Sequence, residues 1–517
     1  MVLIRSIATI GTMTLISRVL GFVRDVLIAA LLGAGAGADA FFVAFKFPNL
    51  FRRLFAEGAF NLAFVPLYAG DLETEGPDSA RAFAEQALSV LLWSLLVFVA
   101  AFEILMPWAM YVFAPGFAAD PDKFSLAVIL TRITFPYLLF ISMVSLLAGV
   151  LNSHGRFAAA AATPILLNLF LIGAVLVLVP LMPSPGHALA WGVAGAGVAQ
   201  FAWLYVHCVK AGVRLRLVRP RLTAKVKTLL KRMAPVAVGA GIYQLNLLID
   251  TVIASLLPSG AISYLFFADR VTQLPLGVVG VAAGTALLPL LSRQLQAGEG
   301  SAALTSQNRA LEFVFLLTLP AAVALFVIAG PIVTVLFERG AFDAMAAQAT
   351  ASALAVYALG LPAYVLVKAL APGYFARGDT ATPIKVGALA MVVNLGLNLV
   401  LMGPFLHVGI AMATAVSSWL NAGLLALILF RRGHLRLDGQ LKRRLPRMIL
   451  ASVLMGLGLY TAVGGLDGML AGGEGARIAA LVLLVGVGGV TYMVLAQLTG
   501  AARLKSLKAL MRGDTAA

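Results

Sequence analysis

Apolar stretches long enough to cross a lipid bilayer recur about every 35 to 40 residues along this chain, and a spanning helix needs about 20 such residues. Of the 517 residues, 61% are hydrophobic and 12% are charged, whereas roughly 25% are charged in soluble domains. The pattern predicts an all-α integral membrane protein of about fourteen transmembrane helices. We expect them near residues 6–32, 38–68, 84–113, 125–151, 160–181, 188–210, 230–257, 261–291, 308–337, 345–371, 382–403, 407–430, 447–464 and 476–499.

The composition also excludes several function classes. The single cysteine, Cys208, cannot form an internal disulfide, and the five histidines show no zinc-ligand spacing. No GxxxxGK phosphate loop is present, and the loops are too short to hold an enzyme's catalytic site. We therefore expect neither an enzyme nor a cofactor or metal. The net charge of +16 is explained by membrane topology, so no nucleic-acid partner is expected.

The distribution of lysine and arginine predicts the topology. Residues 210–232, 431–447 and the C-terminal tail are rich in these cations, which places them in the cytoplasm. The loops 33–38, 180–190, 258–260 and 403–406 contain none and should face outward. Both termini are then cytoplasmic. The acidic loop 71–78 is a weak exception, because acidic residues count little in this rule.

Two parts of the sequence match each other. DVLIAALL at Asp25–Leu32 aligns with DTVIASLL at Asp250–Leu257, in the same orientation. Chance similarity of apolar text is the alternative. A parallel repeat predicts two six-helix lobes around a central cavity, as in several transporter folds. The lobes are expected at residues 1–222 and 223–436, with two extra helices in residues 437–517.

Charged residues interrupt the apolar segments. Arg18 and Arg24 lie well inside the segment near 6–32, and an arginine at the bilayer centre costs about 2.5–3.5 kcal/mol on insertion scales. Such residues normally face an aqueous cavity. In the segment near 38–68, Lys46, Asn49 and Arg52 are i,i+3 neighbours and should form one polar stripe.

Two interpretations of these charges remain open. They could be structural ion pairs, such as Arg24 with Asp25 or Asp39, and Arg270 with Asp269. Alternatively they bind a ligand, because arginine makes bidentate contacts with phosphate oxygens. The group is rich in cations and spread over both halves, which favours a phosphate-bearing anion. The candidate substrate-binding residues are Arg18, Arg24, Arg52, Arg270, Asp39, Lys46, Asn49, Glu57 and Gln273.

The stretch SRVLGFVRDVLIAALLGAGAGADAFFVAFKFPNLFRRLFAEGAFNLAFVPLY, from Ser17 to Tyr68, resembles the opening of the MurJ (MviN) lipid II flippase family. GYFARGDTATPIKV, from Gly373 to Val386, is similar to a second signature of that family. That family belongs to the multidrug/oligosaccharidyl-lipid/polysaccharide (MOP) exporter superfamily. Its members have two lobes that give alternating access to a central cavity. The resemblance implies that lipid II, the undecaprenyl-pyrophosphate-linked peptidoglycan precursor, is moved to the outer leaflet of the bacterial inner membrane.

The resemblance also assigns residues. The family's cavity arginines correspond to Arg18, Arg24, Arg52 and Arg270, and Asp39 and Glu57 match further polar positions. Some relatives carry a sodium site, for which the candidates here are Asp250, Asn394, Asn398 and Thr414. Only one of these is a carboxylate, so a hydrogen-bonded cluster that joins helices is the alternative.

The resemblance further implies that the last two helices form a groove for the polyprenyl tail; an ordinary lipid-facing pair is the alternative. Sodium and the membrane potential are the candidate driving forces. The expected partners are lipid II, membrane lipids and cell-wall synthesis proteins. Two rival functions are a flippase for another polyprenyl-linked glycan and a drug or cation antiporter of the MATE type, although cation efflux requires acidic cavity walls.

Overall fold

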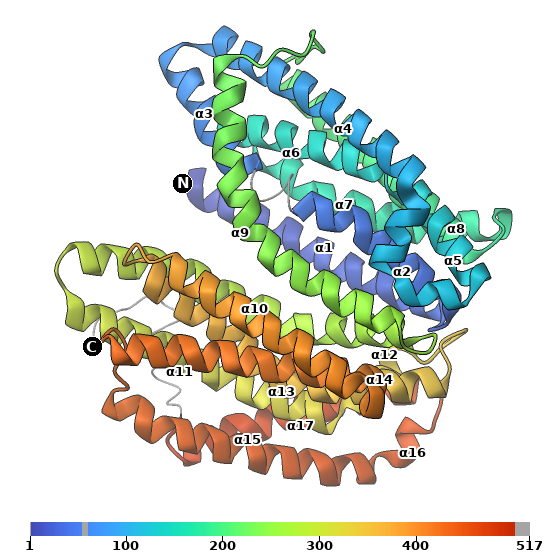
Figure 1. Ribbon diagram of the computed structural model, residues 1–517. Coiled ribbons are helices and arrows are strands. Elements are labelled where there is room, and N and C mark those ends of the chain that lie inside the picture. The colour runs from blue at the N-terminus through green and yellow to red at the C-terminus, as the bar shows by residue number, and fades with distance from the viewer. Residues whose placement is uncertain (1, 54–59, 502–517) are drawn as a thin grey trace. The chain divides into compact units, whose positions relative to one another are not determined.

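The computed structural model describes residues 2–53 and 60–501, and the elements in this part of the chain are helices (Figure 1). Their only strand-like pairing is one antiparallel bridge between Arg339 and Phe342. The predicted all-α class is confirmed. Among the candidate site residues, Glu57 lies outside the described residues.

Within the described residues, nine helical stretches are long and apolar enough to cross a membrane, which confirms a multi-span membrane protein. They are α4 (Pro77–Phe113), α5 with α6 (Pro121–Ser153), α7 with the turns after it (Phe157–Leu181), α8 (Pro185–Lys210), α11 (Gly300–Val327), α13 (Ala344–Phe375), α14 (Ala381–Arg431), α15 (Gly439–Gly465) and α17 (Glu474–Leu498). Helix α14 covers both segments expected at 382–403 and 407–430, which are separated by a kink at Leu406 (φ 50°).

Four of the expected segments fall outside this apolar set. They correspond to α1 (Val2–Leu32), α2 with α3 (Ala36–Phe51 and Asn61–Thr74), α9 (Ala224–Ser255) and α10 (Ala261–Gln296). These are the helices that carry the charged candidate residues, from Arg18 to Arg270. The candidate substrate-binding residues therefore lie on segments whose membrane crossing stays a prediction.

Proline accounts for two helices that are shorter than expected. The segment expected at 125–151 is divided into α5 (Pro121–Thr134) and α6 (Tyr137–Ser153), with Pro136 at the start of α6. The segment expected at 308–337 is divided into α11 and α12 (Ala329–Phe337), whose first turn contains Pro331. Proline lacks the N–H needed inside a helix but is tolerated in its first turn.

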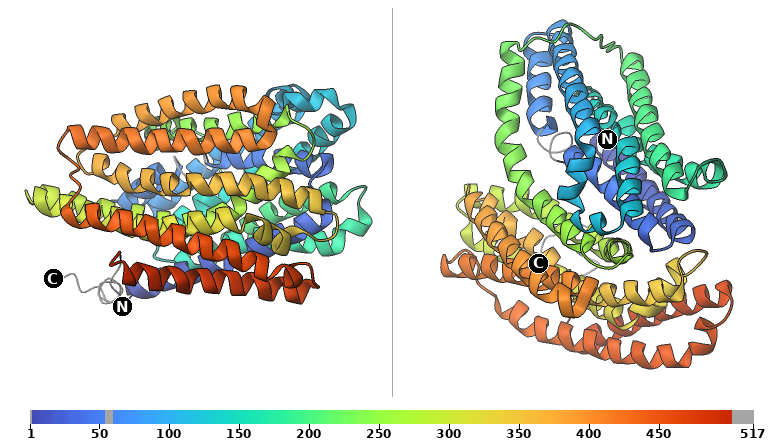
Figure 2. Two further views of the ribbon diagram at one scale, coloured as in Figure 1. Left: turned by 90° about the horizontal axis from the view of Figure 1, so that it is seen from below. Right: turned by 45° about the vertical axis from the view of Figure 1, so that its right-hand side comes forward.

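The chain forms two compact units. Unit 1 comprises residues 1–263 and 339–342, and unit 2 comprises residues 264–338 and 343–517. In unit 1, α1 packs on α7 (Phe157–Gly173), α2 packs on α5, and α9 runs beside α3 and α4 (Figure 2). In unit 2, α11 packs on α13, and α13 packs on α14. The division into repeat lobes at residues 222 and 436 stays a prediction.

Aromatic packing fixes α2 within unit 1. The ring of Phe47 on α2 lies 4.2 Å from that of Phe113 at the end of α4, and 5.1 Å from that of Phe135 after α5 (centroid to centroid). Phe51, one turn further along α2, lies 5.3 Å from Phe98 on α4. Edge-to-face pairs of this kind add about 0.5–1.5 kcal/mol beyond area burial. They hold the polar face of α2 in a fixed orientation.

The segment Arg339–Phe342 joins α12 to α13 but belongs to unit 1. The backbone N–H of Ala341 donates to the carbonyl oxygen of Ala30 on α1, at 2.8 Å. Gly340 has a φ of +59°, and a Cβ atom there would lie 2.2 Å from the same oxygen. Only glycine fits this turn without strain.

The acidic loop 71–78 is explained by its contacts with Lys225, in the first turn of α9. Lys225 donates to Asp71 Oδ2 at 2.8 Å and to Glu75 Oε2 at 2.7 Å. These bonds lower the pKa of Glu75 and raise that of Lys225. The acidic loop therefore lies at the same end of unit 1 as the basic segment predicted to be cytoplasmic, and its charge is partly neutralised there.

The last two long helices pack on unit 2. Helix α15 contacts α11 and α17 (Figure 1). Glu312 of α11 accepts hydrogen bonds from Arg309 and from Arg444 of α15, and Arg309 also bonds Asp438, the N-cap of α15. Ionic contacts at this end thus tie α15 to the helices of unit 2.

Candidate functional site

Arg24 is buried in unit 1 by a set of specific partners. Its Nε and Nη2 groups donate to Asp25 Oδ1 at 2.9 and 2.6 Å, and its Nη1 group donates to Asn168 Oδ1 of α7 at 2.9 Å. Asn168 in turn donates through Nδ2 to the carbonyl oxygen of Ser17 at 2.8 Å. Of the two ion pairs left open for Arg24, the structure contains the one with Asp25.

Arg18 differs sharply from Arg24 on the same helix. It lies near the middle of α1, its side chain is exposed, and it makes no hydrogen bond or ion pair with any described residue. If α1 crosses the membrane as predicted, a guanidinium at its middle costs several kcal/mol in hydrocarbon. The position therefore calls for water or an anion beside it.

The polar stripe on α2 has the predicted contact between i,i+3 neighbours. Arg52 Nε donates to Asn49 Oδ1 at 2.9 Å, and Asn49 Nδ2 donates to the carbonyl oxygen of Phe45 at 2.7 Å. One turn before Asn49, the exposed Lys46 donates to Thr251 Oγ1 of α9 at 3.3 Å. The stripe thus presents donors, including cationic ones, along one side of α2.

Asp39, at the start of α2, is only 1% exposed and accepts four hydrogen bonds. Lys123 Nζ donates to it at 2.9 Å, the backbone N–H of Gly260 at 2.7 Å, and the N–H and Oγ of Ser263 at 3.0 and 2.7 Å. Lys123 is also buried, donates to Ser259 Oγ at 3.1 Å and lies 4.3 Å from the centre of the Phe117 ring. The carboxylate therefore joins α2, α5 and the beginning of α10.

In unit 2, the candidate residues lie together on α10. The Arg270 guanidinium lies 4.9 Å from the centre of the Phe266 ring, a cation–π contact one turn away. Gln273 Nε2 donates to Asp269, and both side chains are exposed. Neighbouring Thr272 is buried and donates to its own helix, at the carbonyl oxygen of Ala268.

Three of the four candidate cation ligands meet in unit 2. Asn398 Nδ2 donates to Asn394 Oδ1 at 3.0 Å, and Asn394 Nδ2 lies 3.5 Å from the hydroxyls of Thr414 and Ser417. Asp250 is half-buried on α9 and belongs to unit 1. The described residues contain no cluster of three or more His, Cys, Asp or Glu side chains that could hold a metal. A sodium site stays a prediction.

Sequence reasoning missed two residues of this region, Lys123 and Asn168. The sequence did contain a signal for Lys123. It lies in a loop predicted to face outward, and four other loops predicted to face outward contain no lysine or arginine. Asn168 had none, since a single amide in an apolar helix does not reveal a partner 144 residues away.

Comparison with known proteins agrees with this architecture. The profile of the family described as lipid II flippase MurJ matches residues 28–466. The chain is 48% identical over 468 residues to a "Probable lipid II flippase MurJ" of Rhizobium meliloti (strain 1021), which covers 90% of this chain and 87% of the relative.

Solved structures share the fold. One described as "Lipid II flippase MurJ, inward closed conformation" superposes with a TM-score of 0.78 at 24% identity and covers 95% of this chain and 98% of its own. An inward-facing MATE transporter of the MOP superfamily superposes with a TM-score of 0.68 at 12% identity, over 82% of this chain and 97% of its own. The helical fold is therefore that of MurJ and MATE proteins, and the chain belongs to the MurJ family of lipid II flippases.

Proposed function

We propose that this protein moves lipid II from the cytoplasmic to the outer leaflet of the bacterial inner membrane. The observation that carries the proposal is Arg18, an exposed guanidinium near the middle of α1. An anionic headgroup that passes this position would neutralise the positive charge of Arg18, which hydrocarbon chains cannot do. The relative from Rhizobium meliloti, named as a lipid II flippase, supports the choice of cargo.

The pyrophosphate is assigned to the arginines, which can contact phosphate oxygens in a bidentate manner. The arginines assigned to it are Arg18, Arg24, Arg52 and Arg270. The remaining headgroup contacts are assigned to Lys46, Asn49, Gln273 and Glu57. Asp39 already accepts four hydrogen bonds, so we assign it the positioning of α2 against α10.

Transport follows if the two conformations of the protein bind the pyrophosphate with different affinity, because only differential binding shifts a conformational equilibrium. Outward movement of negative charge from a negative interior releases about 2.3 kcal/mol per charge per 100 mV. The membrane potential could thus drive the cycle, with sodium at Asp250, Asn394, Asn398 and Thr414 as the other candidate. We assign both termini to the cytoplasm, and α15 and α17 to the polyprenyl tail.

The cationic candidate residues also argue against an organic cation as the cargo. The chain shares its fold with MATE transporters, but an organic cation would be repelled by Arg18, Lys46 and Arg52. A polyprenyl-linked glycan other than lipid II has the same phosphate chemistry, so the transport assay must compare cargoes directly.

The test is a leaflet-accessibility assay for lipid II in cells that depend on this protein. Replacement of Arg18 by Ala is expected to trap lipid II in the inner leaflet while the protein stays folded and inserted. Arg18→Lys keeps the charge but loses the bidentate contact and should be partly active. Arg443→Ala removes an exposed arginine at the start of α15 and serves as the matched control. Full activity of Arg18→Ala would remove Arg18 from the site.

A further inference from the structure

A cavity of about 550 Å³ lies in unit 1, apart from the candidate site. It opens where α6 ends, α7 begins and α8 ends, beside the first turns of α1. We call it the α7 pocket. The lining residues that matter here are Met13, Arg156, Ala159, Ala162, Trp203 and His207.

The rim of the α7 pocket carries donors. Arg156 is exposed and uses one N–H, on Nη1, to bond the carbonyl oxygen of Lys210 at 3.2 Å. Its other N–H groups make no hydrogen bond to a described residue. His207 Nδ1 lies 2.8 Å from the carbonyl oxygen of Trp203. A carbonyl can only accept, so Nδ1 is the donor, and Nε2 on the opposite side of the neutral ring is an acceptor; the free donors of the rim are therefore those of Arg156.

The inner wall of the α7 pocket is apolar. Trp203 is 38% exposed, and its Nε1 group donates to the carbonyl oxygen of Ala159 at 3.1 Å, which fixes the indole against α7. The Trp203 and His207 rings lie 4.3 Å apart. Met13 and Ala162 complete a surface without charge. A cationic rim above an apolar wall matches a molecule with an anionic head and a hydrocarbon chain.

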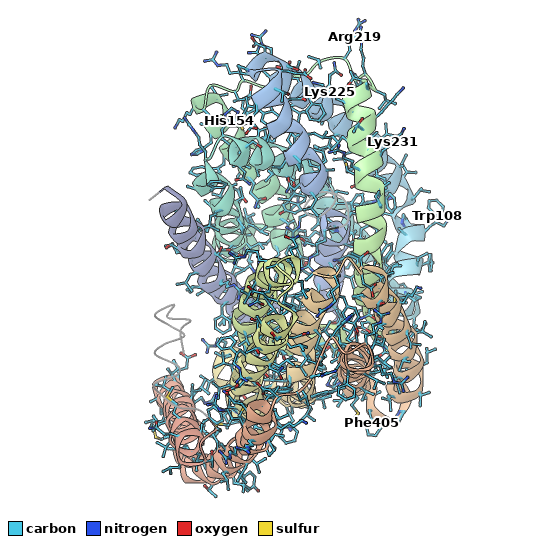
Figure 3. All side chains as sticks on the ribbon, turned by 90° about the vertical axis from the view of Figure 1, so that its left-hand side faces the viewer. Trp108, His154, Arg219, Lys225, Lys231 and Phe405 are labelled. Atoms are coloured by element: carbon cyan, nitrogen blue, oxygen red, sulfur yellow. The ribbon has the colours of Figure 1, made fainter. Side chains whose placement is uncertain are left out.

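The location agrees with this chemistry. In Figure 3, His154, in the turn between α6 and α7, lies at the same end of unit 1 as Arg219 and Lys225 of the basic segment. Burial lowers the pKa of His154, and the positive charge of Arg156 lowers it further. That end is the one assigned to the cytoplasm, where anionic lipids attract basic side chains. Tryptophan is also enriched at the membrane interface.

We propose that the α7 pocket binds an anionic phospholipid of the cytoplasmic leaflet, with its phosphate on Arg156 and an acyl chain on Trp203 and Met13. The site is separate from the proposed lipid II route and rests on the proposed topology only for the choice of leaflet. A free phosphate ion would use the rim but leave the apolar wall uncovered.

The experiment uses Trp203 as the probe. The full-length protein is reconstituted in phosphatidylcholine vesicles that contain a few per cent of phosphatidylglycerol with brominated acyl chains, which quench tryptophan in contact. The part of the quenching that disappears in Trp203→Phe reports the α7 pocket, since the chain has five tryptophans. We expect brominated phosphatidylglycerol to quench Trp203 more than brominated phosphatidylcholine does at equal mole fraction.

Arg156→Gln should weaken this preference about fivefold, the effect of one cation near an anionic surface. Arg443→Gln, far along the chain on α15, should leave it unchanged. Native mass spectrometry of delipidated protein titrated with phosphatidylglycerol gives the same comparison without the Trp203 variant. Equal quenching by both lipids, or an unchanged preference in Arg156→Gln, would overturn the proposal, as would displacement of the lipid by millimolar inorganic phosphate.

Binding is measured here without transport, so the result is independent of lipid II flipping. If purified lipid II displaces the brominated phosphatidylglycerol from Trp203 at equimolar amounts, the pocket belongs to the substrate route and the proposal is wrong. If Arg18→Ala abolishes flipping and leaves the Trp203 quenching intact, the two sites are separate as proposed.

Discussion

Replacement of Lys123 by Met tests whether the buried pair with Asp39 holds unit 1 together. Both side chains are buried, at 6% and 1% exposure, so solvent does not screen the contact. The variant removes one of four hydrogen bonds to the carboxylate, and a bond to a charged group is worth about 1.5–3 kcal/mol. Three donors from Gly260 and Ser263 remain, so we expect a loss of about 2–3 kcal/mol in the free energy of unfolding.

Asp39→Ala should cost more than Lys123→Met. It removes all four bonds and leaves a buried ammonium with only the Ser259 hydroxyl and the Phe117 ring, which places the loss at about 3–5 kcal/mol. The double variant should lose about 2 kcal/mol less than the sum, because neither charge is then left alone.

The free energies are measured by reversible unfolding in mixed detergent micelles with added SDS, followed by circular dichroism. Lys442→Met, an exposed lysine on α15, is the matched control and should change little. Additive losses in the double variant, or a Lys123→Met midpoint equal to the control, would show that the pair does not couple α2 to α5.

Two further predictions concern the ends of unit 1. Gly340→Ala should lower the free energy of unfolding by about 1–3 kcal/mol, because the new Cβ would lie 2.2 Å from the carbonyl oxygen of Ala30. Gly458→Ala is the control. A Cβ there meets nothing within 4 Å, so the same unfolding assay should show no loss. The bond of Glu75 to Lys225 lowers the pKa of the acid, so its contribution is present above the unfolded pKa and is lost as pH falls through the folded one. The protection factor against hydrogen exchange at the end of α3, corrected for the intrinsic pH dependence of exchange, should therefore fall in acid in the parent. In Lys225→Met it should be low throughout; equal acid sensitivity of the protection factors would contradict this.

The sequence was sufficient to predict the helical class, most helix positions and the helices that carry charge. Apolar periodicity is a local property, and so is the i,i+3 spacing that brings Asn49 to Arg52. The i,i+4 spacing of Asn394 and Asn398 likewise places both on one face of a helix, where they form a hydrogen bond. These features depend on helix geometry alone.

Partners that are distant in sequence could not be predicted in this way. Asp39 was expected near Arg24 or the substrate, but its partner Lys123 is 84 residues away and Ser263 is 224 residues away. Arg24 could pair with Asp25 or with Asp39, and the packing of α1 on α7 also decides between them. The sequence contains prolines at the breaks before α6 and α12. Hydropathy alone nevertheless predicted one continuous helix across each break.

The origin of unit 1 from two stretches of sequence has a consequence for biosynthesis. The turn Arg339–Phe342, which bonds Ala30, is translated only after residues 264–338 of unit 2. A ribosome that has delivered all nine amino-terminal helices has therefore not yet made the last piece of the bundle they form. Unit 1 is therefore incomplete at this turn until α10, α11 and α12 have been made, so the completion of unit 1 depends on the synthesis of part of unit 2.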